Sequence, residues 1–319
     1  MARFDFTTLG EGVIRLSVPP GTRIEEAVRF DVTAGGAEAN VAAALVQLGW
    51  KCGWASALPS TPTGLRVLNE FRRRGIDCSS VLMRSKGRVG CCFIEFAHPP
   101  RSTRVVFDRR ESCFAQMTSD EMDWEYLLDT GHLHVSGLTV PLSPFSENIV
   151  ASALEKARER SLSTSLDINY RHLLWPESEA RTRLLPLTEG TDILFCSLRD
   201  ARKVFECVGE PELVARRLAE QAGVANCVIT LGDRGALAWD GATLWHEKAW
   251  QVPVIDRIGA GDALAAGVIF GWKQGSLKQG LRYGNLMAAL ALTQCGDVVS
   301  TSLEELDRLL AGPVEDIVR

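Results

Sequence analysis

Short apolar segments that read as strands alternate with longer segments that read as helices through most of this 319-residue chain. Strands and helices that alternate in this way form a mostly parallel sheet with helices on both faces. The strand-like segments are 53–58, 132–136, 163–167, 192–195 and 227–231, and the helix-like segments are 37–48, 63–74, 144–160, 177–187 and 211–222. After residue 254 the chain reads as helical, over 262–274, 277–295 and 302–310. We therefore expect an α/β fold with a helix layer on each side of a central sheet.

One region interrupts this alternation. Residues 88–96 and 104–108 read as two strands, and the turn-rich segment 98–103 between them predicts a hairpin. Residues 27–32 alternate apolar and polar side chains with period two, the pattern of a strand with one face exposed to solvent. These strands predict a small antiparallel sheet outside the main layer.

The small sheet would draw on residues from about 12–33 and 88–109 and would cover a cleft as a lid. We expect one domain over 1–319, of which this lid is a part. The free edge and face of such a sheet also suit a homodimer.

Composition restricts the partners that the protein can take. The formal net charge is −5 and the pI is near 5.7, whereas a nucleic-acid-binding face is normally basic, so we expect no nucleic-acid partner. No apolar run reaches the about 18 residues of a membrane helix, and no signal segment is visible, so we expect a cytoplasmic protein with no membrane partner. The nine cysteines are irregularly spaced and odd in number, which favours reduced thiols over a disulfide framework.

A glycine-rich turn, Gly259-Ala260-Gly261, leads into a helix-like segment and places Asp262 at its mouth. Small residues let consecutive backbone N–H groups point at one bound group, and the helix dipole adds positive potential, so the turn suits an anion. A carboxylate at this point opposes anion binding, but it suits a base that takes the proton of a hydroxyl attacking a phosphoryl group. The alternative is that Asp262 only caps a helix over 263–274. This segment alone leaves both interpretations open.

Three further clusters bring glycines or polar side chains to the ends of expected elements. The pair Gly35-Gly36 precedes a helix that carries Asn40. Asp167, Asn169 and Arg171 follow a strand, where ligands gather in open α/β sheets; Arg171 suits a carboxylate or phosphate, or alternatively a surface ion pair. The segment from Thr230 to Gly235 follows another strand, and it suits either a phosphate close to the backbone or an ordinary turn.

In this order, these segments resemble the ribokinase-like (PfkB) family of sugar kinases, and the resemblance covers nearly the whole chain. Both signature regions of that family are visible: the glycine pair leading to Asn40, and Asp256-Arg-Ile-Gly-Ala-Gly-Asp262. Within the family, the likeness is nearest to the branch that phosphorylates 2-keto-3-deoxygluconate. Segments 35–41, 106–109, 167–175, 256–262 and 296–300 carry this likeness.

The resemblance implies a ribokinase-like αβα fold with a β lid, and it assigns roles to individual residues. Asp262 would be the base, and Gly259, Ala260 and Gly261 the anion hole for the moving phosphoryl group. The sugar acid would be bound by Gly35, Gly36, Asn40, Arg109, Asp167, Asn169 and Arg171. ATP would lie against Ser197, Thr230, Gly232, Gly235 and Asn285, with Mg²⁺ bridging its phosphates. Asp256 and the carbonyl of Ile258 would hold a monovalent cation such as K⁺.

The sequence departs from the family pattern in three places. The family usually shows Asn-x-x-Glu after the strand at 192–195, whereas this chain reads Ser197-Leu-Arg-Asp200, so the acid is replaced by Arg199 or shifted to Asp200. Cys92 and Phe107 stand where tyrosines often supply hydroxyls to the sugar. Arg257 replaces a common threonine, and Arg15 replaces an acid of some neutral-sugar relatives; both changes favour an acidic sugar.

The expected activity is ATP-dependent phosphorylation of a small sugar acid, with 2-keto-3-deoxygluconate going to its 6-phosphate as the leading reaction. A neutral-sugar or nucleoside kinase of the same family is one alternative. The other alternative is a catalytically weak sugar-acid sensor, which the changed metal motif motivates.

Overall fold

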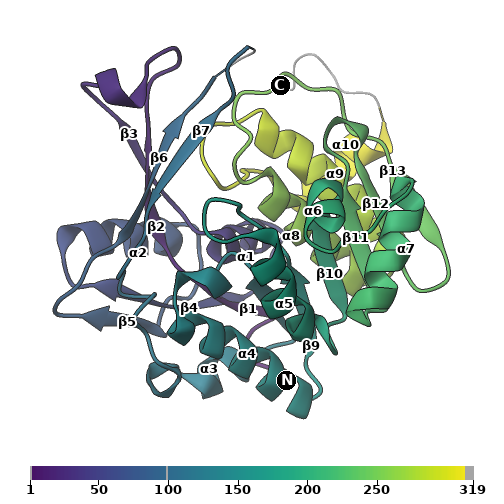
Figure 1. Cartoon of the computed structure of the whole chain (residues 1–319), viewed down its shortest axis with the longest axis horizontal. Coiled ribbons are helices and arrows are strands. Elements are labelled where there is room, and N and C mark those ends of the chain that lie inside the picture. Colours follow the sequence, from purple (N-terminus) through teal and green to yellow (C-terminus); the bar gives the residue numbers. More distant parts are fainter. Residues whose placement is uncertain (1, 98–99, 313–319) are drawn as a thin grey trace.

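The computed structural model describes residues 2–97 and 100–312, and its main body is a large sheet between two layers of helices (Figure 1). The strand order in this sheet is β13-β12-β11-β10-β9-β8-β1-β4-β5. All neighbours from β11 to β5 pair in parallel, and β12 and β13 extend the sheet by two antiparallel pairings. The strands are β1 (Phe6–Leu9), β4 (Cys52–Pro59), β5 (Val81–Arg84), β8 (His132–Ser136), β9 (Ser163–Asp167), β10 (Ile193–Ser197), β11 (Asn226–Thr230), β12 (Ala236–Trp239) and β13 (Leu244–Glu247). The expectation of a mostly parallel central sheet is confirmed.

A second, smaller sheet stands away from this body, at the upper left in Figure 1. Its order is β3-β2-β6-β7, with β2 (Val13–Ser17), β3 (Asp31–Gly35), β6 (Gly90–Glu95) and β7 (Arg104–Asp108). The two outer pairings are antiparallel as expected, but β2 and β6 pair in parallel because both strands leave the main body in the same direction. The predicted hairpin turn at 98–103 includes residues 98 and 99, which lie outside the described residues.

The helices form two groups that share separate apolar cores. One core packs α1 (Ala37–Gln47), α2 (Pro62–Arg73), α8 (Ala260–Gln274), α9 (Leu277–Leu292) and α10 (Leu303–Ala311) against the large sheet. The other core packs α3 (Trp124–Leu128), α4 (Pro144–Glu159), α5 (Glu177–Thr188), α6 (Leu198–Lys203) and α7 (Pro211–Ala222). The central strands are buried on both faces, as the strand-helix alternation predicted. In the described part of the chain, no helix has the length and apolar character that crossing a bilayer requires.

Some boundaries differ from the sequence-based expectation. The strand expected over 27–32 begins only at Asp31, and a short 3₁₀ helix at Ile24–Glu26 precedes it. The last two strands, β12 and β13, were not expected, since each has only four residues and glycines lie beside them. The helix expected from residue 262 or 263 begins at Ala260, which changes the interpretation of Asp262 below.

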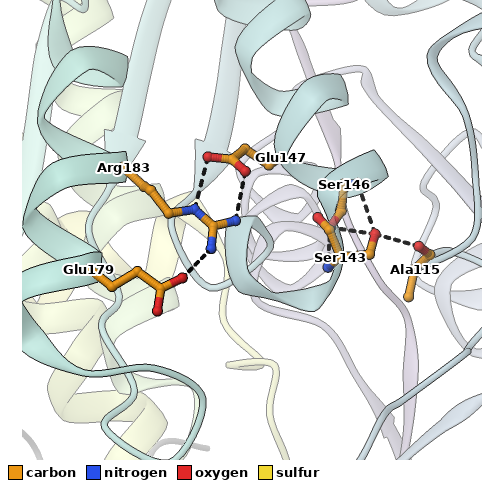
Figure 2. A network of polar contacts seen from close by, with 6 residues as sticks. All are labelled: Ala115, Ser143, Ser146, Glu147, Glu179 and Arg183. Carbon is orange, nitrogen blue, oxygen red and sulfur yellow. Dashed lines mark hydrogen bonds and ion pairs between the residues drawn. The ribbon is translucent and has the colours of Figure 1, made fainter.

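Figure 2 shows polar contacts around α4, among them an ion pair that joins α4 to α5. Arg183 donates to both carboxylate oxygens of Glu147, at 2.9 and 2.7 Å, and to Glu179 at 2.6 Å. Ser143 caps the first turn of α4 and also donates to the carbonyl of Ala115. Partly exposed pairs of this kind contribute about 1 kcal/mol or less each, so they orient the two helices rather than hold the core together.

Candidate active site

A cavity of about 350 Å³ lies where the carboxyl ends of the parallel strands meet the inner face of the small sheet. Asp167 ends β9, Ser197 ends β10 and Thr230 ends β11, and these strands are neighbours in the sheet. The order of the strands thus brings together three side chains that are far apart in sequence, at the edge where ligands bind in open α/β sheets. The small sheet contributes Val13, Cys92, Val105 and Phe107, and α1 and α8 contribute Asn40, Gly261 and Asp262. The remaining polar lining comes from segments between the elements: Glu11, Gly36, Arg109, Asn169, Arg171, Arg257, Gly259 and Asp297.

The glycine-rich turn forms the N-terminus of α8 at the wall of this cavity. Gly259 is the N-cap, with φ of 85°, and a methyl group on it would overlap the carbonyl oxygen of Asp297. Glycine is therefore required here both for the left-handed backbone and for the close packing. A methyl group on Gly261 would meet nothing within 4 Å. The N–H groups of a first helical turn have no carbonyl partner within the helix, so this open end suits an anion.

Asp262 is not the cap of this helix. It lies in the first turn of α8, and no side chain caps the helix at Gly259, so the alternative interpretation of Asp262 as an N-cap is wrong. Instead, Asn40 Nδ2 on α1 donates to Asp262 Oδ2 at 2.7 Å. This contact joins the two helices whose glycine-rich N-termini stand out in the sequence.

The surroundings of Asp262 make it a stronger base than a carboxylate in water. Burial raises its pKa to about 7, the carboxylates of Asp167 and Asp297 add to this rise, and the Asn40 hydrogen bond and Arg171 oppose it. A general base works best when its pKa is near the working pH, so Asp262 suits proton abstraction near neutrality.

Three guanidinium groups border the same cavity, and they differ in their partners. Arg109 is 8% exposed, and its Nε donates to Glu11 Oε2 at 2.5 Å. Arg171 and Arg257 are exposed at the rim, and within the described residues neither has a carboxylate partner. The surface ion pair that would have accounted for Arg171 is thus not found in the described part of the chain. Two cations at a cavity that have no carboxylate within ion-pair distance among the described residues suit an anionic ligand.

Asp167 and Asn169 line the same cavity as Arg171. Asn169 has a φ of 40°, which asparagine tolerates better than most residues, and its N–H donates to Asp167 Oδ1 at 3.1 Å. Burial raises the pKa of Asp167 to about 6, although Arg171 lowers it. These polar groups suit the hydroxyls of a sugar.

A neighbouring groove of about 680 Å³ runs from Arg171 past the ends of β10 and β11. Ser197, Thr230 and Gly232 line it, together with the cationic side chains of Arg199, Arg202 and Lys203. Small backbone-exposing residues beside cations suit a polyphosphate.

Two residues that were predicted for nucleotide binding lie outside both cavities. Gly235 packs closely against the backbone at the end of β13. A methyl group on it would overlap the carbonyl oxygen of Glu247. Asn285 is buried in α9, and its Nδ2 donates to the carbonyl oxygen of Lys248 at 2.5 Å. Both contacts stabilise the fold in this structure.

Asp200 lies three residues after Ser197, the spacing at which the resemblance expects the acid of a metal motif. Ser197 caps α6 by accepting from the N–H of Asp200 at 3.0 Å, so the two residues keep the i, i+3 spacing of Asn-x-x-Glu. Asp200 is buried and lines both cavities, and its Oδ1 has no hydrogen-bond partner among the described residues. An acid is thus present at this spacing, and Arg199 Nε lies 3.5 Å from Asp200 Oδ1. No group of three or more His, Cys, Asp or Glu side chains in the described ranges forms a complete metal site.

Sequence reasoning missed Glu11 and Asp297, which both line the cavity. Asp297 lies in the segment 296–300 that carried the family likeness, but an aspartate at this place does not by itself indicate a function. Arg15, which the sequence marked only as an unusual cation, forms ion pairs with Asp256 and Asp297. Cys92 and Phe107 form an apolar wall where hydroxyls were expected in related chains.

A family model described as pfkB family carbohydrate kinase matches residues 7–303. The chain is 34% identical to a 2-dehydro-3-deoxygalactonokinase of Haloferax volcanii over 97% of each chain. It is 30% identical to the crystal structure of a 2-dehydro-3-deoxygluconokinase from Thermotoga maritima, with a TM-score of 0.91 over 96% of this chain and 98% of that chain. An uncharacterized sugar kinase from Pyrococcus horikoshii, solved in complex with ATP, shares the fold at 22% identity, with a TM-score of 0.81 over 96% and 97% of the two chains.

Proposed function

Since the chain belongs to the pfkB family of carbohydrate kinases, we propose that it uses ATP to phosphorylate a hydroxyl of a small sugar acid, 2-keto-3-deoxygluconate in the first instance, giving the 6-phosphate. One observation carries the proposal: Arg171 and Arg257, which have no carboxylate partner in the described ranges, border the cavity that holds Asp262. A neutral sugar offers these cations no anionic group, whereas a sugar acid offers a carboxylate at one end and a primary hydroxyl at the other.

Asp262 would take the proton of the attacking hydroxyl, and the open N–H groups at Gly259, Ala260 and Gly261 would stabilise negative charge on the group being transferred. Asn40 would orient Asp262 through its hydrogen bond and leave the Oδ1 atom for the hydroxyl. The polar atoms of Gly36, Asp167 and Asn169 would fix the sugar, and Arg109 and Arg171 would hold its carboxylate. Gly35 would contribute only through its packing against Asp297.

ATP supplies the phosphoryl group when it is bound. The groove beside the cavity fits a polyphosphate, since Ser197, Thr230 and Gly232 line it with three cationic side chains. Asp200 Oδ1 is buried and accepts no hydrogen bond from the described residues, and its one cationic neighbour there, Arg199 Nε, lies 3.5 Å away, so it fits a water molecule of Mg²⁺, an ion that usually keeps several waters and binds few carboxylates. This place for Asp200 weakens the case for a sensor without catalysis.

Two sugar acids compete for the role of substrate. The relatives named above act, by their names, on a 2-dehydro-3-deoxy sugar acid of the galacto or of the gluco configuration, which differ at one carbon. The apolar wall at Cys92 and Phe107 offers no hydroxyl to distinguish such epimers. We therefore expect turnover of both compounds, at rates within an order of magnitude of each other.

An ADP-release assay tests the proposal with both epimers, gluconate, fructose and adenosine as acceptors. We expect turnover of the keto-deoxy acids and little turnover of fructose or adenosine. Turnover of fructose or adenosine without turnover of any acid would contradict the substrate class while leaving a kinase. ATP-independent binding of the acid without ADP release would favour the sensor.

We further propose that the chain acts as one kinase unit and forms a homodimer through the outer face of the small sheet. Val32, Leu16, Phe93 and Val106 are cross-strand neighbours in one row on that face, and Val32 and Val106 are 45% and 39% exposed. A Val106→Glu variant that sediments as a monomer, when the unchanged chain is a dimer, would support this interface.

A cytoplasmic location is consistent with the nine cysteines, which are all free.

A further inference from the structure

Arg15 is a buried cation between two carboxylate residues that contact the glycine-rich turn before α8. It lies on β2 of the small sheet, is 3% exposed, and forms ion pairs with Asp256 and Asp297. Its Nε donates to Ser17 Oγ at 2.9 Å. Each of its three nitrogen atoms therefore has a partner, which fixes the guanidinium in one orientation.

Asp256 connects this cation to the backbone of the turn. Its Oδ1 accepts from the N–H of Ile258 at 2.9 Å, and its Oδ2 accepts from the N–H of Gly296 at 3.2 Å as well as from Arg15. The position of Asp256 therefore determines where the chain enters Gly259.

Asp297 connects the cation to both glycine-rich helix N-termini. Its carbonyl oxygen lies against Gly259, and its carboxylate lies against Gly35, so that a methyl group on either glycine would overlap it. Arg15 thus joins the small sheet, the segment before α8 and the segment after α9 at one point.

Two carboxylates buried this closely need a cation, because an uncompensated buried charge is strongly destabilising. The family resemblance places an exchangeable monovalent cation at Asp256. The residues of this chain do not fit such a cation, since both oxygens of Asp256 already accept backbone hydrogen bonds and the guanidinium of Arg15 is paired with Oδ2. Arginine stays charged at any working pH and cannot dissociate.

We propose that Arg15 is the permanent counter-cation of the anion-binding turn, so that the kinase needs no K⁺ and positions the N-terminus of α8 through a side chain of its small sheet. Arg15 is a positioning residue, since it is not among the residues that line the cavity and it acts through Asp256 and Asp297. This inference rests on the proposed function for its kinetic readout.

The first test uses the unchanged protein and compares KCl with tetramethylammonium chloride at equal ionic strength. We expect the same kcat within about twofold in the two salts, since the guanidinium of Arg15 takes the place of K⁺. The midpoint of thermal unfolding should also be the same in both salts. A kcat that rises several-fold with K⁺, or an unfolding midpoint that rises with K⁺, would overturn the proposal.

The second test uses Arg15→Met, which keeps the apolar volume of the side chain and removes its charge. We expect kcat to fall on the order of a hundredfold, with KM for the sugar acid changing less, because the turn contributes mainly to the transition state. Added K⁺ should restore part of the kcat and raise the unfolding midpoint of this variant alone. A variant that keeps normal kcat in tetramethylammonium would contradict the role of Arg15.

Arg104→Met is the matched control, because Arg104 is an exposed arginine of the same sheet that pairs with Glu25. It should keep normal kcat and show no K⁺ response. If Arg15→Met does not fold, Arg15→Lys decides together with the salt comparison. Since it retains a buried cation, its kcat and unfolding midpoint should not rise with K⁺, and a rise of either would contradict the proposal. If the unchanged protein phosphorylates no sugar acid, the proposed function fails, while the unfolding midpoints still test the cation.

Discussion

Asn40 on α1 and Asp262 on α8 are joined by a hydrogen bond of 2.7 Å across 222 positions of sequence. Each residue lies in the first turns of a helix that begins at a glycine, so the contact brings the N-termini of α1 and α8 together at one cavity. It also leaves one oxygen of Asp262 without a hydrogen-bond partner in the described part of the chain. This arrangement orients a carboxylate without using up its capacity to accept a proton.

Replacing Asp262 by Asn should abolish most of the catalysis and leave the fold intact. The change removes the base, so we expect kcat to fall by roughly two to four orders of magnitude, with a small change in KM. Steady-state kinetics of ADP release measure the loss, and circular dichroism checks the fold. Near-normal turnover would mean that another group takes the proton.

The rate should depend on pH through Asp262. Its pKa of about 7 means that the basic form is lost as pH falls, so kcat/KM should decrease tenfold per pH unit well below pH 7. Because the Asn40 hydrogen bond lowers this pKa, Asn40→Ala should move the acid limb to higher pH. A limb that stays in place in Asn40→Ala would show that the titrating group is not Asp262.

The same raised pKa predicts how stability depends on pH. The folded protein binds a proton at Asp262 more tightly than the unfolded chain does, so the ionised residue lowers the free energy of unfolding as pH rises from about 4 through 7. Asp262→Asn should therefore be more stable than the unchanged protein above pH 7 and about equally stable near pH 4. Urea unfolding at the two pH values measures the difference, and equal effects at both would contradict the buried carboxylate.

Arg171→Ala should weaken the binding of sugar acids selectively. Losing one charge-assisted contact with a carboxylate costs about 1.5 to 3 kcal/mol, so KM for the acid should rise roughly ten- to a hundredfold. Stability should change by no more than about 0.5 kcal/mol, because Arg171 is exposed. An unchanged KM for the acid would favour a neutral substrate.

The sequence predicted the parts of the site that follow from local pattern and strand order. Asp167 and Thr230 were expected at the cavity because the carboxyl ends of parallel strands share one edge. Arg15 and Asp297 could not be paired in advance, since 282 positions separate them and no local pattern marks either as a partner. The start of α8 was placed too late because glycines read as a turn, although they allow the first helical turn to lie against Asp297.

Arg109 should behave differently from Arg171, because it is buried with Glu11. Arg109→Met removes a partner from a carboxylate whose other oxygen, Oε1, already has no hydrogen-bond partner among the described residues. Breaking a buried ion pair in this way costs about 3 to 5 kcal/mol, so the midpoint of urea unfolding should fall clearly. Adding Glu11→Gln removes the uncompensated charge and should recover much of this stability, while KM for the sugar acid stays high. If Arg109→Met has a normal unfolding midpoint and only a raised KM, the guanidinium binds the ligand and does not stabilise the fold. If both variants have a normal KM, Arg109 stabilises the fold only, and Arg171 and Arg257 bind the carboxylate of the substrate.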